Sequence, residues 1–220
     1  MSEAEAPGDR EEGLALIRQM ADVSRETVAR LDAYAALLVR WQRAKNLVGP
    51  ETLRHLWVRH FADSAQLLPL APKARCWVDL GSGAGLPGMV VAILLADLPD
   101  AEIHLVESNA RKCAFLRAAA RETGAPAKIH ATRIADFVTG FRGTADAVTA
   151  RALAPLKDLV AMTAPLVDGG AIGLFHKGRE VEAELTAASG YWKLNVERVP
   201  SRTHSDGTIL VLHGCAAKGV

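Results

Sequence analysis

Apolar positions in the first third of the chain recur with the spacing of amphipathic helices. Residues 14–20 and 28–41 carry an apolar side chain every three or four positions, which is the period of one helix face. Ser24 precedes the second run and is a typical N-cap residue. Gly49–Pro50 ends that helix, and a third helical stretch is predicted over Glu51–Leu70. The pattern predicts an all-helical region from about residue 14 to residue 70.

The pattern changes after residue 75, where short β-rich runs alternate with helical ones. Alternation of this kind predicts a doubly wound α/β fold whose sheet is mostly parallel. The last two strands have no helix between them, so we expect an antiparallel hairpin at one edge. The predicted strands are Cys76–Leu80, Ile103–Glu107, Lys128–Ala131, Asp146–Ala150, Gly170–Phe175, Leu194–Val199 and Thr208–His213. The predicted helices between them are Leu86–Ala96, Asn109–Thr123, Leu156–Leu166 and Glu180–Ala188.

This organisation divides the chain into three predicted parts. Residues 1–12 are expected to form a disordered acidic tail, 13–72 a helical extension, and 73–220 the α/β domain. A chain of 220 residues with 50% apolar and 23% charged residues has the composition of a globular protein. It has no apolar run that would cross a bilayer and no signal-peptide core. We therefore expect a cytoplasmic monomer that makes no membrane contact.

The cysteines and the charged residues bear on two possible functions, metal binding and contact with phosphates. Cys76, Cys113 and Cys215 lack metal-type spacing, which favours reduced thiols and no metal site. The net charge of +1 hides two basic stretches, 40–60 and 108–133. Each is either a solvated helix face or part of a surface that meets phosphates.

The most informative segment is the glycine-rich turn between the first predicted strand and the helix that follows. It runs from Val78 to Gly88 and reads VDLGSGAGLPG. Glycines there let the backbone turn sharply and approach a ligand closely. Glu107 ends the next strand, where a carboxylate can accept both ribose hydroxyls of an adenosine. Glycines and an acid at this spacing predict a nucleoside cofactor.

The spelling of the turn leaves two cofactors to weigh. The frame from Gly83 to Gly88 fits the dinucleotide pattern G-x-G-x-x-G, so an NAD(P)-dependent oxidoreductase is one interpretation. Pro87 within the turn and Asp79 ahead of it favour the other. The pattern D-x-G-x-G-x-G with a distal acid resembles motif I of class I S-adenosylmethionine-dependent methyltransferases, for which we expect a Rossmann-like fold.

The end of the fourth predicted strand bears on the methyl acceptor. Ala150–Leu156 reads ARALAPL, and it has neither the Asn/Asp-Pro-Pro-aromatic motif of exocyclic-amine methyltransferases nor the cysteine of 5-methylcytosine enzymes. An arginine there suits an acceptor that already has a free lone pair, such as a ring nitrogen. Guanine N7 is one, and it needs positioning more than proton removal. This reasoning permits N7 without requiring it.

At this point the chain resembles a known family, the bacterial small-subunit rRNA guanine-N7 methyltransferases of the glucose-inhibited division protein B type. The resemblance extends from about Leu31 to Leu212. It departs at Asn46-Leu47-Val48, where the family commonly has Asn-Leu-Thr. It is carried by Leu38–Trp41, Arg59–Ser64 (RHFADS), Asp79–Gly88, Glu107–Lys112 (ESNARK), Ala150–Leu156 and Lys177–Gly178.

The resemblance implies S-adenosylmethionine as methyl donor and a guanine in the 530 loop of 16S rRNA, within the small ribosomal subunit, as acceptor. It implies direct in-line methyl transfer to N7. The implied cofactor residues are Asp79, Gly81, Gly83, Gly85, Leu86, Glu107, Arg151 and the backbone of Ile134 and Ala135. The implied RNA-binding rim is Arg111, Lys112, Arg133 and Lys177.

Several of these residues have a structural interpretation beside the functional one. Arg151 either faces the cofactor and the target base or pairs with a nearby carboxylate. His60 and Asp63 lie three residues apart, so they share a helix face. They either contact the methionine end of the cofactor or the base, as catalytic residues, or brace the helical segment. The family commonly has an acid where this chain has Ala135, and Asp136 follows it.

Three other functions remain alternatives. The first is a methyltransferase for another RNA or a small molecule, and the second is an NAD(P)-dependent oxidoreductase. The third is a non-catalytic RNA-binding protein that keeps the fold. The intact glycine turn and Glu107 argue against the last of these.

Overall fold

A computed structural model describes residues 6, 8–45, 47, 49 and 53–219. The family departures at Asn46 and Val48, the predicted break at Pro50 and residues 1–5 and 7 of the predicted tail lie outside this part of the chain. The described strands are β1 (Cys76–Leu80), β2 (Glu102–Glu107), β3 (Ala127–Ala131), β4 (Ala147–Arg151), β5 (Ile172–Lys177), β6 (Trp192–Pro200) and β7 (Thr208–Ala217).

Helices precede the first strand and follow most of the others. The described helices before β1 are α1 (Asp9–Arg18), α2 (Arg25–Lys45), the π-helix η1 (Trp57–Ala62), α4 (Asp63–Ala65) and the 3₁₀ turn η2 (Leu68–Leu70). Those after it are α5 (Gly88–Leu94), α6 (Ala110–Thr123), α7 (Ile134–Gly140), α8 (Leu156–Asp168) and α9 (Val181–Ser189).

The seven strands form one sheet in the order β3-β2-β1-β4-β5-β7-β6. β1 to β5 pair in parallel, and β7 is antiparallel to both β5 and β6. This confirms the predicted mostly parallel, seven-stranded α/β sheet with an antiparallel hairpin at one edge. The sequence pattern did not indicate that β7 lies between β5 and β6, which leaves β6 at the edge of the sheet.

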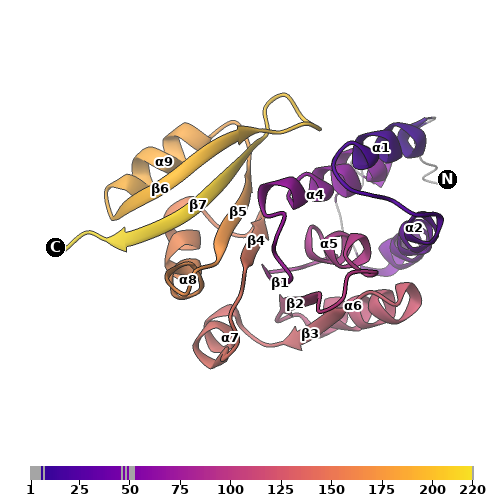
Figure 1. The fold of residues 1–220 in the computed structure, drawn as a ribbon, viewed down its shortest axis with the longest axis horizontal. Coiled ribbons are helices and arrows are strands. Elements are labelled where there is room, and N and C mark those ends of the chain that lie inside the picture. The colour runs from indigo at the N-terminus through magenta and orange to yellow at the C-terminus, as the bar shows by residue number, and fades with distance from the viewer. Residues whose placement is uncertain (1–5, 7, 46, 48, 50–52, 220) are drawn as a thin grey trace.

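Helices cover both faces of this sheet (Figure 1). α5 and α6 pack on one face with α2 outside them, and α7 and α8 pack on the other. Successive side chains of a strand point to opposite faces, so Trp77 joins the core under α5 and α6 while Val78 and Leu80 join the core under α8. β1 is apolar on both sides because both sides are buried.

The crossover helices after β1 and β4 lie on opposite faces of the sheet, and β1 and β4 are neighbours. Such a reversal leaves a crevice at the carboxyl ends of the two strands, which is where open α/β sheets bind ligands. The glycine turn follows β1, and Arg151 ends β4. The fold therefore brings both sequence segments to the same edge.

The predicted disordered tail is wrong where the structure describes helix. α1 begins at Asp9, and the Asp9 carboxylate is buried. It accepts hydrogen bonds from the backbone N–H of Trp57 at 2.8 Å and of Val58 at 3.4 Å. Arg10 forms a two-pronged ion pair with Asp32 of α2, at 2.7 Å for both contacts. Asp9, which looked like part of a solvated tail, makes tertiary contacts instead.

Two further elements differ from the sequence pattern. α7 was not predicted, because its seven residues are too short a run to show a helical period, and Phe137 is its one buried residue. β5 begins and ends two residues later than expected. As a result His176 and Lys177 lie at the carboxyl end of that strand, beside Arg151 on β4.

Candidate active site

The glycine turn connects β1 to α5 with a backbone that side chains would obstruct. Gly81, Gly83 and Gly85 all have positive φ, at 68°, 57° and 86°, a region that glycine enters without steric cost. A Cβ on Gly85 would lie 2.7 Å from the Cβ of Met89. A Cβ on Gly83 would meet nothing nearer than 3.7 Å. Gly83 therefore leaves open space above the turn.

Asp79, near the end of β1, anchors the far end of this segment. Its Oδ2 accepts the Gly88 N–H at 3.3 Å, and its Oδ1 accepts the Thr149 hydroxyl of β4 at 2.8 Å. Burial raises the pKa of this carboxyl to about 6, although these hydrogen bonds and Arg151 oppose the shift. A Cβ on Gly88 would lie 2.7 Å from Oδ2, so only glycine fits there.

Glu107 holds the turn from the neighbouring strand. Its Oε2 accepts the Gly83 N–H at 3.0 Å, and its Oε1 accepts the Asn109 N–H at 2.7 Å. Asn109 in turn caps α6 through the N–H groups of Arg111 and Lys112. Each carboxylate oxygen has further acceptor capacity, which two ribose hydroxyls can use.

A third contact comes from the helical extension. The Tyr34 hydroxyl of α2 donates a hydrogen bond to the Ala84 carbonyl within the turn. The ring is fully buried and stacks on Phe61 with centroids 5.3 Å apart. Burial raises the pKa of this phenol well above its usual range. The shape of the turn thus depends on α2 as well as on the sheet.

These residues fit a nucleoside cofactor. The turn offers a backbone surface that a Cβ at Gly83 would fill, and the acid that fixes the turn lies at the end of β2. Ile134 and Ala135 begin α7, directly after β3. Leu86 lies buried in the same turn. Every cofactor residue that the sequence predicts therefore lies at or next to the carboxyl ends of β1 to β4.

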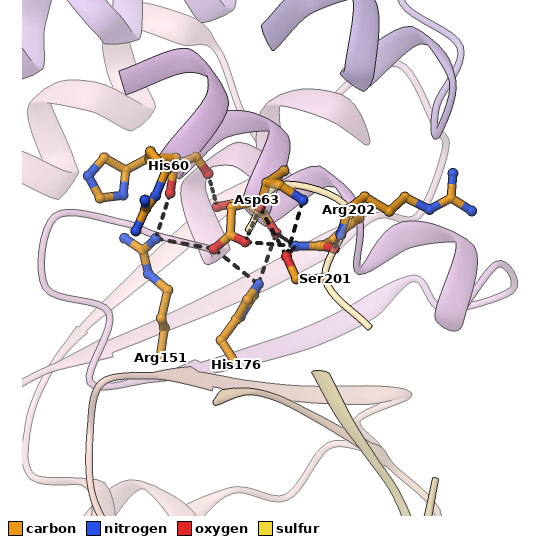
Figure 2. A network of polar contacts seen from close by, with 10 residues as sticks. His60, Asp63, Arg151, His176, Ser201 and Arg202 are labelled. Carbon is orange, nitrogen blue, oxygen red and sulfur yellow. Dashed lines mark hydrogen bonds and ion pairs between the residues drawn. The ribbon is translucent and has the colours of Figure 1, made fainter. Parts of the chain in front are cut away.

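Asp63, at the start of α4, is the centre of a polar cluster (Figure 2). Its Oδ2 lies 3.5 Å from both Arg151 Nη1 and His176 Nε2, which rise from the sheet below it. Its Oδ1 accepts hydrogen bonds from Gln66 Nε2 and the Thr203 hydroxyl, both at 2.7 Å. The cluster joins the helical extension, the ends of β4 and β5, and the loop between β6 and β7.

The cluster forms one wall of a cavity of about 660 Å³. This volume is in the range of small-molecule sites. Leu153 lines this cavity and also lies against the glycine turn, because a Cβ on Gly81 would lie 2.6 Å from its Cδ1. The cavity and the glycine turn are therefore neighbours. The ionisable side chains that line the cavity include Arg59, His60, Asp63, Arg151, His176 and Glu184.

His60 projects into this region without a partner. Both ring nitrogens are buried, and neither has a hydrogen-bond partner among the described residues. Burial, together with the charge of Arg151, lowers the pKa of this imidazole to about 3. His60 is therefore neutral at pH 7, with one donor and one acceptor available. The π-helix η1 that carries it is a distortion found frequently at functional sites.

His176 is a member of the cluster that sequence analysis missed. Its Nε2 lies 2.9 Å from the Asp63 carbonyl oxygen, which only accepts, so Nε2 carries the proton. Nδ1 is then an acceptor, and it has no partner in the described part of the chain. Burial lowers the pKa of this imidazole. The usable signal was its place at the end of a strand, next to Lys177.

The predicted RNA-binding rim is only partly at the surface. Arg111 and Arg133 are exposed at the starts of α6 and α7, and Lys112 is half-buried. Lys177 differs, because its side chain is only 8% exposed and is paired with Glu184. The placement of Lys177 in a solvent-facing rim is therefore corrected. Tyr34, like His176, was missed; nothing in its apolar surroundings marks it in the sequence.

Two kinds of feature are absent from the described residues. Within the part of the chain that the structure describes, no group of three or more His, Cys, Asp or Glu side chains is arranged to hold a metal ion. Among the same residues, no helix is long and apolar enough to cross a membrane.

The sheet order, the glycine turn after β1 and the acid at the end of β2 define a class I methyltransferase fold. Solved structures agree. A methyltransferase of Podospora anserina bound to SAH matches with a TM-score of 0.60 at 12% identity, over 91% of this chain and 93% of that one. The O-methyltransferase TomG of Streptomyces achromogenes, in complex with SAM, matches at 0.57 and 14%, over 93% and 96%.

Sequence comparison identifies the family. The GidB model, described as rRNA small subunit methyltransferase G, matches residues 27–209. A ribosomal RNA small subunit methyltransferase G of a Methylobacterium species is 58% identical over 93% of this chain and 94% of its own length. Another, from a Bradyrhizobium species, is 55% identical over 88% and 87%. The chain belongs to the GidB family of methyltransferases, which confirms the resemblance.

Proposed function

We propose that this protein transfers a methyl group from S-adenosylmethionine to N7 of a guanine in the 530 loop of 16S rRNA, by direct in-line transfer. It would act as a monomer in the cytoplasm. The observation that carries the proposal is the cavity beside the glycine turn in a chain that belongs to the GidB family. A turn and a cavity that share one bordering side chain, Leu153, lie close enough together to suit direct transfer.

S-adenosylmethionine, when bound, supplies an electrophilic methyl group. Gly81, Gly83 and Gly85 would admit it against the backbone, and Glu107 would accept its ribose hydroxyls. Asp79 and Tyr34 would act at one remove, because they fix the turn at Gly88 and Ala84. Leu86, Ile134 and Ala135 would border the cofactor. Arg151 is proposed to lie where cofactor and target base meet.

Methyl transfer to guanine N7 requires positioning of the base rather than removal of a proton. Guanine N7 has a free lone pair, so the chain needs no general base and no covalent nucleophile. His60 would offer its unpartnered nitrogens to the base edge. Asp63 would offset the charge of Arg151, so that the guanidinium can lie beside a base that becomes cationic on methylation. His60, Asp63 and Arg151 are the residues that we propose contact or orient the acceptor.

RNA would be held mainly through its phosphates. Arg111, Lys112 and Arg133 lie at the carboxyl edge of the sheet, on the same edge as the glycine turn. Phosphate contacts of this kind supply affinity and strong salt dependence. Sequence-specific recognition of RNA targets unstacked bases that enter a pocket.

The test is incubation with labelled S-adenosylmethionine and small ribosomal subunits from cells that lack the enzyme. Mass spectrometry of the nucleosides should find 7-methylguanosine in 16S rRNA. Cofactor binding without rRNA label would send the search to another RNA or a small molecule, and bound NADH would favour an oxidoreductase.

Two glycine variants make the experiment specific to the turn. Gly83→Ala places a Cβ in the proposed cofactor space at φ 57°. Gly124→Ala introduces a matched strain at φ 63°, at the end of α6, where a Cβ would meet nothing within 4 Å. Gly83→Ala should abolish labelling at low cofactor concentration, and Gly124→Ala should retain it. Equal loss in both would contradict the assignment.

A further inference from the structure

The connection between β4 and α8 has a strained backbone. Ala152 has φ +51°, a left-handed conformation that costs a non-glycine residue energy. Its side chain is exposed, so packing of the methyl group does not explain the conformation. Strain of this kind persists only where the surroundings impose it. The contacts of the neighbouring residues must therefore hold the loop in place.

The strained residue determines where Leu153 lies. The Leu153 side chain contacts Gly81 closely, since a Cβ there would lie 2.6 Å from Cδ1. Leu153 also lines the cavity of the polar cluster. It therefore borders both the glycine turn and the acceptor cavity, and its place depends on the loop backbone.

Two charged side chains hold this loop from the adjacent strand and helix. Lys177 Nζ, at the end of β5, donates to the Ala154 carbonyl at 2.9 Å and to Glu184 Oε2 at 2.6 Å. The same Oε2, on α9, accepts the Leu156 N–H at 2.6 Å. The residues on both sides of Pro155 are thus hydrogen-bonded, beginning two positions after the strained residue.

This pair differs from the ordinary ion pairs of the surface. The Lys177 and Glu184 side chains are 8% and 25% exposed. On the same helix, Glu182 pairs with Arg198, and those side chains are 69% and 56% exposed. Exposed pairs contribute little, whereas a desolvated pair bonded to backbone groups fixes geometry.

We infer that Lys177 and Glu184 form a clamp that holds the loop 152–155 in its strained conformation and so positions Leu153 at the border of the glycine turn and the acceptor cavity. Lys177 then acts as a positioning residue rather than as an RNA contact. The inference rests on the proposed function for its catalytic consequence, but not for its structural one.

The structural consequence is tested by hydrogen exchange of the protein without ligands. The double variant Lys177→Met/Glu184→Gln releases the Ala154 carbonyl and leaves no unpaired buried charge. The amide oxygen of the new glutamine can still accept the Leu156 N–H. The backbone N–H groups of residues 152–154 and 156 should exchange faster than in the wild type, since Pro155 has none. Glu182→Gln, the control on the same helix, should leave them unchanged.

The catalytic consequence is tested with small subunits. In the double variant, kcat at saturating S-adenosylmethionine should fall about tenfold, because the reactants are misplaced. The KM for the cofactor should change much less, since the glycine turn is held by other residues.

Glycine at the strained position separates positioning from general destabilisation. Ala152→Gly removes the penalty of positive φ, so it should be nearly silent in the wild type. In the double variant it should raise kcat about threefold to fivefold. A clamp that only stabilises the fold would show no such rescue.

The outcomes distinguish this inference from the proposed function. Absence of rRNA methylation by the wild type overturns the proposed function, and the exchange experiment still decides the clamp. Unchanged exchange over 152–156 in the double variant overturns the clamp. Unchanged kcat, or a loss that Ala152→Gly does not relieve, overturns its catalytic role.

Discussion

Single side chains hold the glycine turn from three directions. Asp79 binds its far end from β1, Glu107 binds Gly83 from β2, and Tyr34 binds Ala84 from α2. Each makes its contact with a backbone group of the turn. That leaves the glycine surface free for a ligand.

Removal of the Tyr34 hydroxyl should loosen the turn without emptying the core. In Tyr34→Phe the ring still stacks on Phe61, but the Ala84 carbonyl loses its donor. We expect stability to fall by about 1 kcal/mol and the Kd for S-adenosylmethionine to rise about fivefold, measured by calorimetry. Thr163→Val, which removes a buried hydroxyl in α8, is the control. An equal Kd in both variants would contradict the role.

Asp79 should make stability depend on pH. Burial raises its pKa from 3.8 to about 6, so between these values the folded state keeps a proton that the unfolded state has lost. This contribution to stability is complete below pH 3.8 and is lost as pH rises through 6. The difference in unfolding free energy between the wild type and Asp79→Asn should fall by roughly 3 kcal/mol across that window. Urea titrations between about pH 4 and 8 would show it, and a pH-independent difference would refute it.

At the scale of elements, the helical extension is part of the site rather than an addition to it. The π-helix η1 carries His60 and leads directly into Asp63. α1 packs on η1, and Asp9 accepts the N–H groups at its start. α2 supplies Tyr34. The position of η1 over the sheet therefore depends on α1, the element that begins inside the predicted tail.

Asp9→Ala should show this dependence. It leaves the N–H groups of Trp57 and Val58 without their acceptor in a buried place. We expect a loss of about 2 kcal/mol of stability, measured by urea unfolding. Glu12→Ala, on an exposed position of the same helix, should cost much less. Similar losses in the two variants would show that Asp9 is an ordinary surface acid.

At the scale of the whole molecule, charge is distributed by the topology of the sheet. Loops at the carboxyl ends of parallel strands gather at one edge, which places Arg111, Arg133 and Arg151 at the same edge of the sheet. The net charge of +1 conceals this arrangement. An edge that combines a cofactor turn, a cavity and basic side chains suits an RNA substrate.

The basic edge should determine the salt dependence of RNA binding. In Arg111→Gln/Arg133→Gln, the slope of log Kd against log salt should fall by about one for each phosphate that the variant no longer binds. Fluorescence anisotropy with an rRNA fragment measures it. Arg121→Gln, at the other end of α6, should keep the wild-type slope. A matching decrease for Arg121→Gln would mean that the edge is not the RNA surface.

Local chemistry explains what the sequence determined by itself. Periodicity of apolar residues locates most strands and helices, because a buried face needs a repeat of about 2 or 3.6 residues. The glycines and Asp79 specify the turn, because glycine enters those φ values without steric cost and a buried acceptor fixes Gly88. The whole extent of β1 follows from the same local rules.

The tertiary structure alone decided which distant residues meet. β7 lies inside β6, and Lys177 turns inward to Glu184, because pairing and desolvation depend on neighbours that are remote in the chain. Asp9 is a buried acceptor rather than a tail acid for the same reason. His176 and Tyr34 join the site only through packing. The sequence shows which polar side chains are available, and only the folded chain decides which of them are desolvated and which residues they pair with.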